Sequence, residues 1–416
     1  MFRKKDFFGN FSFKSQKFNK NLKEAKKVLN LLESDIKNYN IPLLESYKKE
    51  YQFDFSEATI NKFYKYKNII IVGMGGSILG AKTIYSFLKK KIKKEVFFFD
   101  NLDENLHINF NKIKNLKNSC FIIVSKSGNT LETITNFGIF FSKSLLKNKL
   151  IIITETQDNA LSNIANKLNA EIIEHKDFIG GRYSVLSEVG MFPAALMGLD
   201  IYQFKNLAQL IKNKNFASCL IKNVASIYTL NLEGKKNSIV LNYDSSLNNL
   251  AYWYQQLSCE SLGKKGHGIT VNLSPAPRDH HSLLQLYLDG PKDKFFTFFN
   301  SSSKKDKFIV SQKAIPNSMK FLKNKKLGSI IKAQSNATKK IFSANKIPFR
   351  QFTFNKNNEK ELGIIFTFFV LETILLARLM KINPFDQPAV EMVKIETRKI
   401  QTAASLRLVA FRSKHT

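Results

Sequence analysis

Short apolar runs alternate with helical patterns along most of this chain, and this alternation constrains its fold more than any other feature. Continuous apolar runs of this length are typical of strands that are buried on both faces, and intervening helices supply the crossovers of a parallel sheet. The sequence therefore predicts the α/β class with mainly parallel sheets. The candidate strands are residues 68–72, 96–99, 120–124, 150–153 and 171–173, then 238–242, 269–273, 295–298 and 351–354.

The two sets of runs predict two αβα sandwich domains of similar architecture. A chain of 416 residues is also long for a single core. We expect a helical segment that wraps the domains rather than forming a core, two domains joined by a helical bridge, and a C-terminal segment. Their expected bounds are 1–65, 66–200, 201–235, 236–382 and 383–416.

The most apolar segment, residues 363–380, is predicted to be a buried helix rather than a membrane span, because it contains Glu372 and Arg378. The aromatic stretches 295–299 and 366–369 are interpreted as core elements and not as platforms for stacking bases. We therefore expect no membrane partner.

The chain carries 65 Lys and Arg against 33 Asp and Glu, a net charge of +32. Clustered cations would indicate nucleic acid, but these lysines are scattered along the whole chain. Asn, Ile and Phe are also abundant, and all of these residues have AT-rich codons, so base composition explains much of the charge. We expect no nucleic-acid partner, although a positive field favours anionic substrates.

The three cysteines, Cys120, Cys219 and Cys259, are odd in number and lack CxxC spacing. They predict neither a disulfide framework nor a zinc site. A reducing, cytoplasmic location fits this pattern best, and no apolar signal segment follows the first residues.

Residues 71–80 (IVGMGGSILG) have the pattern of a strand end, a glycine turn and a helix start. The glycine spacing differs from that of dinucleotide-binding loops, and no acidic residue follows at the ribose position. Gly75 and Gly76 permit close backbone approach, and Ser77 places a hydroxyl at a helix N-terminus, where anions bind. Taken alone, the loop fits a tight turn without a ligand nearly as well.

A second loop, within residues 121–133, again ends a strand and opens a helix. Its hydroxyls and its cation would form a phosphate cradle at the helix N-terminus. Helix capping is the alternative, but capping needs only one such residue. The phosphate site is therefore favoured. The candidate ligands are Ser125, Lys126, Ser127 and Thr130.

Six blocks in order resemble the glucose-6-phosphate isomerase family, which has the sugar-isomerase (SIS) fold. They cover most of the chain between residues 73 and 394. Ala389, Val393 and Glu188 depart from the residues usual in the family. The blocks are residues 73–77 (GMGGS), 125–130 (SKSGNT), 180–184 (GGRYS), 256–264 (QLSCESLGK), 281–290 (HSLLQLYLDG) and 383–394 (NPFDQPAVEMVK).

The resemblance implies interconversion of glucose 6-phosphate and fructose 6-phosphate, in glycolysis and gluconeogenesis, without a metal or redox cofactor. The sugar ring opens, and a proton then moves between carbon-2 and carbon-1 through an enediol(ate). Glu260 matches the family base, at the end of a helical pattern that Gly263 terminates. From the segment alone, an ordinary pair between Glu260 and Lys264 on one helix face is the alternative.

Arg182 is expected to stabilise the developing oxyanion, with a buried structural ion pair as an equal alternative. Gly181 would let substrate approach the backbone. The resemblance assigns proton transfer at the ring oxygen to His281, reaching the site of a neighbouring subunit in an obligate homodimer. It assigns ring opening to Lys394 and substrate contact to Gln387.

Two other functions remain open on this evidence. One is a bifunctional phosphoglucose and phosphomannose isomerase. The other is a non-catalytic SIS protein that senses sugar phosphates. Such sensors usually carry a helix-turn-helix domain, and residues 1–65 show no convincing one.

Overall fold

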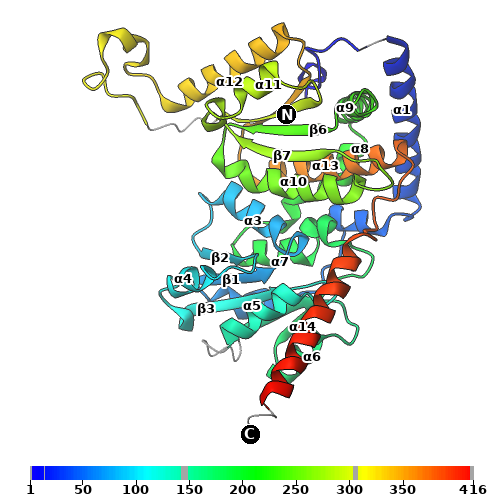
Figure 1. Cartoon of the computed structure of the whole chain (residues 1–416), viewed down its shortest axis with the longest axis vertical. Helices are drawn as coiled ribbons and strands as arrows, with labels where there is room; N and C mark the ends of the chain where they lie inside the picture. The colour runs from blue at the N-terminus through cyan, green and yellow to red at the C-terminus, as the bar shows by residue number, and fades with distance from the viewer. Residues whose placement is uncertain (1, 14, 142–148, 303–307, 413–416) are drawn as a thin grey trace.

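A computed structural model describes residues 2–13, 15–141, 149–302 and 308–412. The chain builds two sheets, and every strand pair in both is parallel. The five-stranded sheet has the order β2-β1-β3-β4-β5, and the four-stranded sheet has the order β7-β6-β8-β9 (Figure 1). The strands are β1 (Asn68–Gly73), β2 (Glu95–Phe99), β3 (Ser119–Val124), β4 (Leu150–Thr154), β5 (Glu171–Glu174), β6 (Asn237–Asn242), β7 (Thr270–Pro275), β8 (Lys294–Ser301) and β9 (Phe349–Phe354). Both the fold class and all the predicted runs are confirmed.

Helices lie between the strands and complete the layers. They are α1 (Ser15–Lys37), α2 (Glu57–Tyr64), α3 (Gly76–Leu88), α4 (Leu106–Asn111), α5 (Leu131–Phe141), α6 (Ala160–Leu168), α7 (Glu188–Leu196), α8 (Leu207–Ile211), α9 (Lys214–Leu232), α10 (Asn248–Leu262), α11 (Leu284–Asp289), α12 (Leu327–Ala344), α13 (Glu359–Leu379) and α14 (Val390–Arg412). Short 3-10 turns include η2 (Pro42–Tyr47), η4 (Gly181–Leu186), η5 (Ile201–Phe204) and η7 (Arg278–His280).

Alternating side chains of the strands enter different cores, which explains the layers. Ile70 and Val72 of β1 enter an outer core, whereas Ile69 and Ile71 enter the large central core. The second sheet divides its side chains in the same way, between the central core and an outer core of its own. Each sheet is therefore buried on both faces, and the two sheets share the central core. The exact domain bounds stay a prediction.

The helix α13 lies in the central core. Among the described residues, α13 is the one helix that is long and apolar enough to cross a membrane. Inside the protein, 83% of its most apolar window is buried. Its aromatic side chains Phe366, Phe368 and Phe369 are fully buried, as are Phe295 and Phe299 of β8. The interpretation of both aromatic stretches as core is confirmed.

The first 65 residues do more than wrap the domains, and in this respect the sequence prediction was wrong. Phe7, Leu32, Leu44 and Tyr47 are buried in the central core. Phe7 also forms an antiparallel bridge with Arg350 on the edge strand β9. The helical pattern did not reveal that side chains of this segment enter the core, because a helix with a charged outer face can still bury its inner face completely.

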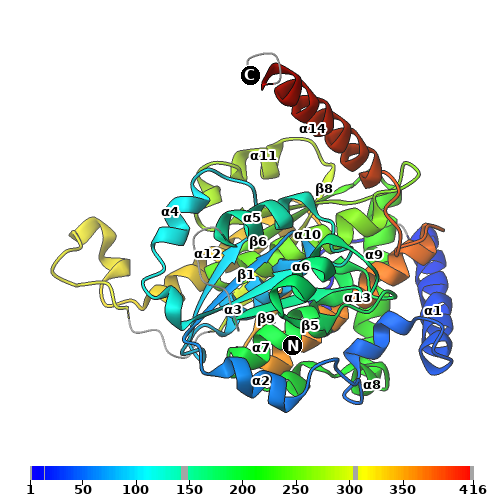
Figure 2. The ribbon, with the colours of Figure 1, turned by 90° about the horizontal axis from the view of Figure 1, so that it is seen from below.

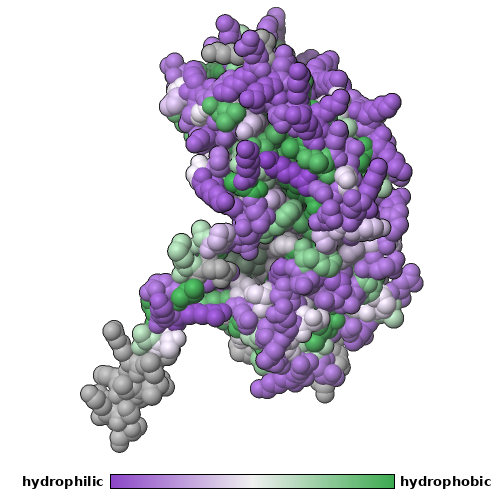
Figure 3. Space-filling view, turned by 90° about the vertical axis from the view of Figure 1, so that its right-hand side faces the viewer, coloured by the Kyte–Doolittle hydropathy of each residue, from purple (hydrophilic) through white to green (hydrophobic). Residues whose placement is uncertain are grey.

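Three elements meet where the two sheets face each other. Helix α3 follows β1, packs against α10 of the second sheet, and also contacts η4 (Figure 1). Helix α14 leaves the body of the molecule and extends away from it, as Figure 2 shows. The face in Figure 3 is largely hydrophilic, as expected for a chain with scattered lysines.

Candidate active site

The two predicted anion-binding loops lie side by side. They follow β1 and β3, which are neighbours in a parallel sheet and end in register at Gly73 and Val124. The carboxyl edge of a parallel α/β sheet is where ligands usually bind. Gly75 has a φ of +53° at the start of α3, a conformation that favours glycine. The strand order thus places the two loops side by side, and the glycine at position 75 permits the turn between β1 and α3.

The arginine turn η4 packs directly on the first loop. A Cβ atom at Gly76 would lie 2.2 Å from the carbonyl carbon and oxygen of Gly181. Only glycine permits this approach of two backbones. A Cβ atom at Gly181, by contrast, would meet nothing within 4 Å. Gly76 therefore has a packing role, and Gly181 borders open space.

Glu260, the predicted base, lies in the last turn of α10, which ends at Leu262 before Gly263 as expected. Its side chain is about one quarter exposed, at 24%. The Nη1 atom of Arg182 donates to Oε1 at 2.8 Å, and the Nε2 atom of Gln256 donates to Oε2 at 3.0 Å. Lys264 pairs with Asp386 instead, at 2.9 Å. The alternative of a Glu260–Lys264 pair is wrong.

Arg182 is buried at 2% exposure, and each of its nitrogens donates a hydrogen bond. Nε donates to Ser261 Oγ at 2.8 Å. Nη1 also donates to Gln387 Oε1 at 2.7 Å, and Nη2 donates to the carbonyls of Pro384 and Asp386 at 2.5 and 3.1 Å. The guanidinium thus joins Glu260 to the C-terminal segment. A buried ion pair, one of the two alternatives for Arg182, is present.

A hollow of about 530 Å³ opens beside Glu260, between α3 and α10. Its walls include Gly75, Leu79 and Tyr252, and the Lys82–Asp100 ion pair lies in it at 2.5 Å. The hollow brings Glu260 together with Gly75 of the first loop.

Gln256 is a site residue that the sequence reasoning missed. Its amide lies in the hollow and donates to Glu260, and its buried Oε1 atom has no hydrogen-bond partner. A buried acceptor without a donor is rare unless a ligand or water supplies one. Two signals were available: Gln256 begins the family block 256–264, and it is four residues before Glu260 and shares its helix face.

The predicted phosphate loop, residues 125–130, is held by hydrogen bonds of its own. Ser125 is buried at 1%, and its Oγ atom lies 2.8 Å from Thr130 Oγ1. Gly128 has a φ of +64°, and the Ser127 hydroxyl accepts from the Asn129 amide at 3.4 Å. The hydroxyl of Thr130 thus contacts Ser125, as a cradle would require.

Lys126 points away from this cradle. Its ammonium group donates to the carbonyl of Asp177 at 2.7 Å and lies 3.5 Å from Glu155. Behind it, His175 is 1% exposed and its Nε2 atom has no hydrogen-bond partner. Burial lowers the pKa of His175 to about 4, so its imidazole is neutral at pH 7.

The structure places His281 and Lys394 on exposed elements. His281 follows η7 and is exposed, whereas its neighbour His280 contacts the Tyr243 hydroxyl at 2.8 Å. Lys394 is exposed in the second turn of α14, and this helix starts three residues after the Arg182-bound Gln387. Among the described residues, neither His281 nor Lys394 lines the hollow beside Glu260.

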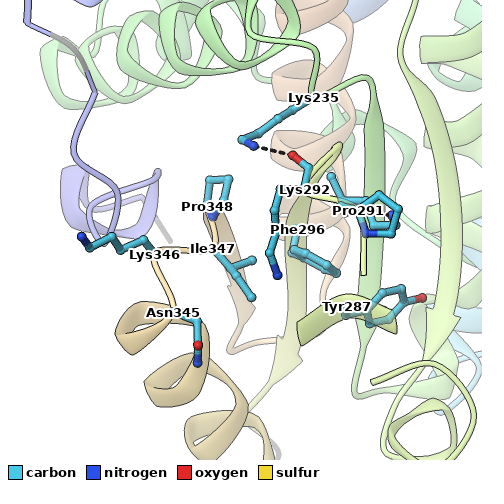
Figure 4. Close-up of a pocket in the computed structure, with 10 residues that line it drawn as sticks. Lys235, Tyr287, Pro291, Lys292, Phe296, Asn345, Lys346, Ile347 and Pro348 are labelled. Carbon is cyan, nitrogen blue, oxygen red and sulfur yellow. Dashed lines mark hydrogen bonds between the residues drawn. The ribbon is translucent and has the colours of Figure 1, made fainter. Parts of the chain in front are cut away.

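A second hollow, of about 180 Å³, lies at the amino-terminal edge of the second sheet (Figure 4). The ammonium group of Lys235 there donates to the carbonyl of Lys292 at 2.5 Å. None of the predicted catalytic or binding residues lines this hollow. The described residues also contain no group of three or more His, Cys, Asp or Glu side chains placed to hold a metal ion.

Comparisons with known proteins agree with this geometry. The family model for phosphoglucose isomerase matches residues 54–277. Glucose-6-phosphate isomerase of Methanocaldococcus jannaschii is 32% identical over 348 residues, which cover 79% of this chain and 83% of the relative. The enzyme of the same name from Onion yellows phytoplasma is 31% identical, with 82% of this chain and 86% of the relative covered.

Solved structures share the fold. A hypothetical protein from Thermus thermophilus superposes with a TM-score of 0.77 at 22% identity, covering 91% of this chain and 94% of that one. A glucose-6-phosphate isomerase from Chlamydia trachomatis gives a TM-score of 0.69 at 19% identity, covering 83% and 71%. The family model spans more than half of the chain, and relatives above 30% identity are covered over most of their length. This chain therefore belongs to the phosphoglucose isomerase family.

Proposed function

We propose that this chain interconverts glucose 6-phosphate and fructose 6-phosphate by ring opening and proton transfer through an enediol(ate). The observation that carries the proposal is the Glu260 carboxylate, held by Arg182 and Gln256 at a hollow that the glycine loop also borders. The curated relatives named glucose-6-phosphate isomerase support the same reaction.

The phosphate would bind at the carboxyl edge of the first sheet. Ser125, Ser127 and Thr130 offer hydroxyls there, and Ser77 lies in the first turn of α3, where the positive end of the helix dipole attracts an anion. Lys126 would have to leave the Asp177 carbonyl to reach the phosphate. It would also have to leave Glu155, which lies 3.5 Å from the ammonium group.

Glu260 would carry the proton between carbon-2 and carbon-1. A carboxylate is a suitable base when it is fixed within hydrogen-bond reach of the carbon acid. Arg182 would hold the Glu260 carboxylate through their hydrogen bond. The charge of Arg182 would also offset the negative charge that develops on the enediolate. Since the N–H groups of Arg182 are engaged, a substrate oxygen would contact it by replacing Gln387. The reaction moves a proton and no net electrons, so it needs no redox cofactor.

The role that we propose for His281 involves a second copy of the chain. His281 is exposed and absent from the lining of its own hollow, and we propose that it acts in a neighbouring subunit. Exposed apolar side chains on α14 support a dimer, since Met392 and Val393 are 68% and 70% exposed.

Lys394, in the second turn of α14, would assist ring opening. We also propose a reducing, cytoplasmic location, in keeping with the three free cysteines.

A coupled assay tests the reaction. The purified chain is incubated with fructose 6-phosphate, glucose-6-phosphate dehydrogenase and NADP, and the formation of NADPH is followed by its absorbance. Steady NADPH formation supports the proposal. Accumulation of mannose 6-phosphate without NADPH would assign a different isomerase, and binding of fructose 6-phosphate without any turnover would assign a sensor.

Mixed dimers test the role of His281. Glu260→Gln and His281→Ala variants, each inactive alone, are refolded together. If His281 acts in the partner, half of the dimers hold one intact site, and about a quarter of the wild-type activity returns. If His281 acts in its own subunit, every site in the mixture is defective and no activity returns.

A further inference from the structure

Two buried charged residues, Glu188 and Lys205, take no part in the proposed chemistry. Both are 0% exposed. Glu188 is the first residue of α7 and follows the arginine turn η4, and Lys205 follows η5. Charges are rarely buried without specific partners, because removing them from water costs folding free energy.

Lys205 bridges two turns from different parts of the chain. Its ammonium group donates to the carbonyl of Ser46 in η2 at 2.5 Å and to the carbonyl of Leu186, the last residue of η4, at 2.9 Å. The rings of Tyr51 and Phe53 lie against the same ammonium, with centroids 4.5 and 4.3 Å away. Cation–π attraction in a buried setting stabilises a charge held in this way.

Glu188 is tied to the same segment. Both of its carboxylate oxygens accept from the Tyr51 hydroxyl at 3.0 Å, and Oε1 also accepts from the Asp54 amide at 3.2 Å. Tyr51 therefore contacts both charged residues. Burial lowers the pKa of Lys205 to about 7, and the negative charge of Glu188 opposes this shift. Burial in turn raises the pKa of Glu188, and the charge that opposes this shift is that of Lys176.

The turn that they hold is the one that carries Arg182. On its outer side, η4 is bound by Lys205 through Leu186 and by the Tyr47 hydroxyl, which donates to the carbonyl of Tyr183 at 2.9 Å. On its inner side, Arg182 reaches Glu260 at 2.8 Å. The position of the guanidinium beside the base therefore depends on where the outer contacts hold the turn.

We propose that Lys205 and Glu188 form a clamp, together with residues 46–54, that positions the η4 turn and hence Arg182 beside Glu260. This inference rests on the proposed isomerase function for its catalytic consequence. Lys205 and Glu188 are positioning residues, since they act through Arg182 and do not touch the hollow where substrate would bind.

A double-mutant cycle with Lys205→Met and Glu188→Gln tests the clamp. Lys205→Met leaves the Ser46 and Leu186 carbonyls without their donor, and Glu188→Gln weakens the acceptor of the Tyr51 hydroxyl and the Asp54 amide, so urea unfolding should shift to lower urea for both. Because both residues contact Tyr51, the loss in the urea midpoint of the double variant should be smaller than the sum of the two single losses. Its kcat should nevertheless stay about tenfold or more below wild type with KM little changed, because the Ser46 and Leu186 carbonyls still lack their donor.

Hydrogen exchange supplies a readout that does not depend on turnover. In Lys205→Met, the η4 amides, such as Ser187 N bonded to Ser184 O, should exchange about tenfold faster or more. Phe342→Leu, in the core on the outer face of the second sheet, is the matched control. It should lower stability and leave η4 exchange and kcat unchanged.

The outcomes separate the two proposals. A double variant with wild-type kcat, or η4 exchange that is unchanged in Lys205→Met, overturns the clamp. A wild-type protein without isomerase activity overturns the proposed function only, since the exchange measurement still decides whether the clamp holds η4.

Discussion

Replacing Gly76 by Ala should disable the site through a single methyl group. Gly76 is the first residue of α3, and its φ does not lie in the left-handed region, so Ala is locally acceptable there. The obstacle is the arginine turn. The new Cβ would lie 2.2 Å from the Gly181 carbonyl and 2.6 Å from the backbone nitrogen of Arg182.

The size of the effect follows from these distances. Non-bonded carbon atoms pack at about 3.5–4.0 Å, so α3 and η4 must separate by roughly 1 Å or more. Overpacking of this kind costs about 1–3 kcal/mol of unfolding free energy. A displacement of about 1 Å at a catalytic group can lower turnover by about 100-fold. We therefore expect a large loss of kcat in a protein that is still folded.

The assay compares two glycine-to-alanine variants by urea unfolding and by the coupled enzyme assay. Gly138 in α5 is the control, because a Cβ there would meet nothing within 4 Å. Gly138→Ala should keep full activity and gain about 0.5–1 kcal/mol from helix propensity. Wild-type kcat and stability in Gly76→Ala would refute the proposed packing of the two backbones.

Three further predictions concern pH and the open side of the arginine turn. The folded pKa of Lys205 is about 7, below its ordinary 10.5. The unfolded chain binds more protons between these values, so stability should rise with pH from 7 upward, and Lys205→Met should lose this rise in urea unfolding. His175 has a folded pKa of about 4 against an ordinary 6.5. Stability should therefore fall as pH drops from 6.5 to 4, by up to about 3 kcal/mol, and His175→Gln should show a shallower loss in acid unfolding. Gly181→Ala places its methyl in open space, so it should fold normally, and a raised KM for fructose 6-phosphate would be the sign that Gly181 borders the substrate.

The sheets were predictable from the sequence because their strands are buried on both faces. A continuous apolar run such as residues 120–124 has few other uses in a soluble domain. The end of α10 at Gly263 was also readable, since a glycine follows a clear helical pattern. Local sequence patterns were therefore sufficient to predict the strands and the end of α10.

Long-range contacts were not readable in this way. The partners of Arg182 include Pro384 and Gln387, some two hundred residues further along the chain. The role of Gln256 depends on a loop from the other sheet, and the direction of Lys126 depends on the carbonyl of Asp177. Only tertiary packing brings such groups together, so residue type and spacing do not reveal them.

The most direct test of the central claim compares the Glu260→Gln variant with the wild type in heavy water. The measured quantity is the uptake of solvent deuterium by the sugar. Fructose 6-phosphate is incubated with each protein, and deuterium at carbon-1 and carbon-2 is followed by NMR together with substrate binding. We predict that the wild type exchanges solvent deuterium into the sugar, whereas the variant binds the sugar phosphate with similar affinity and loses exchange and isomerisation by about 1000-fold or more. Exchange at the wild-type rate in Glu260→Gln would show that another group carries the proton and would contradict the account.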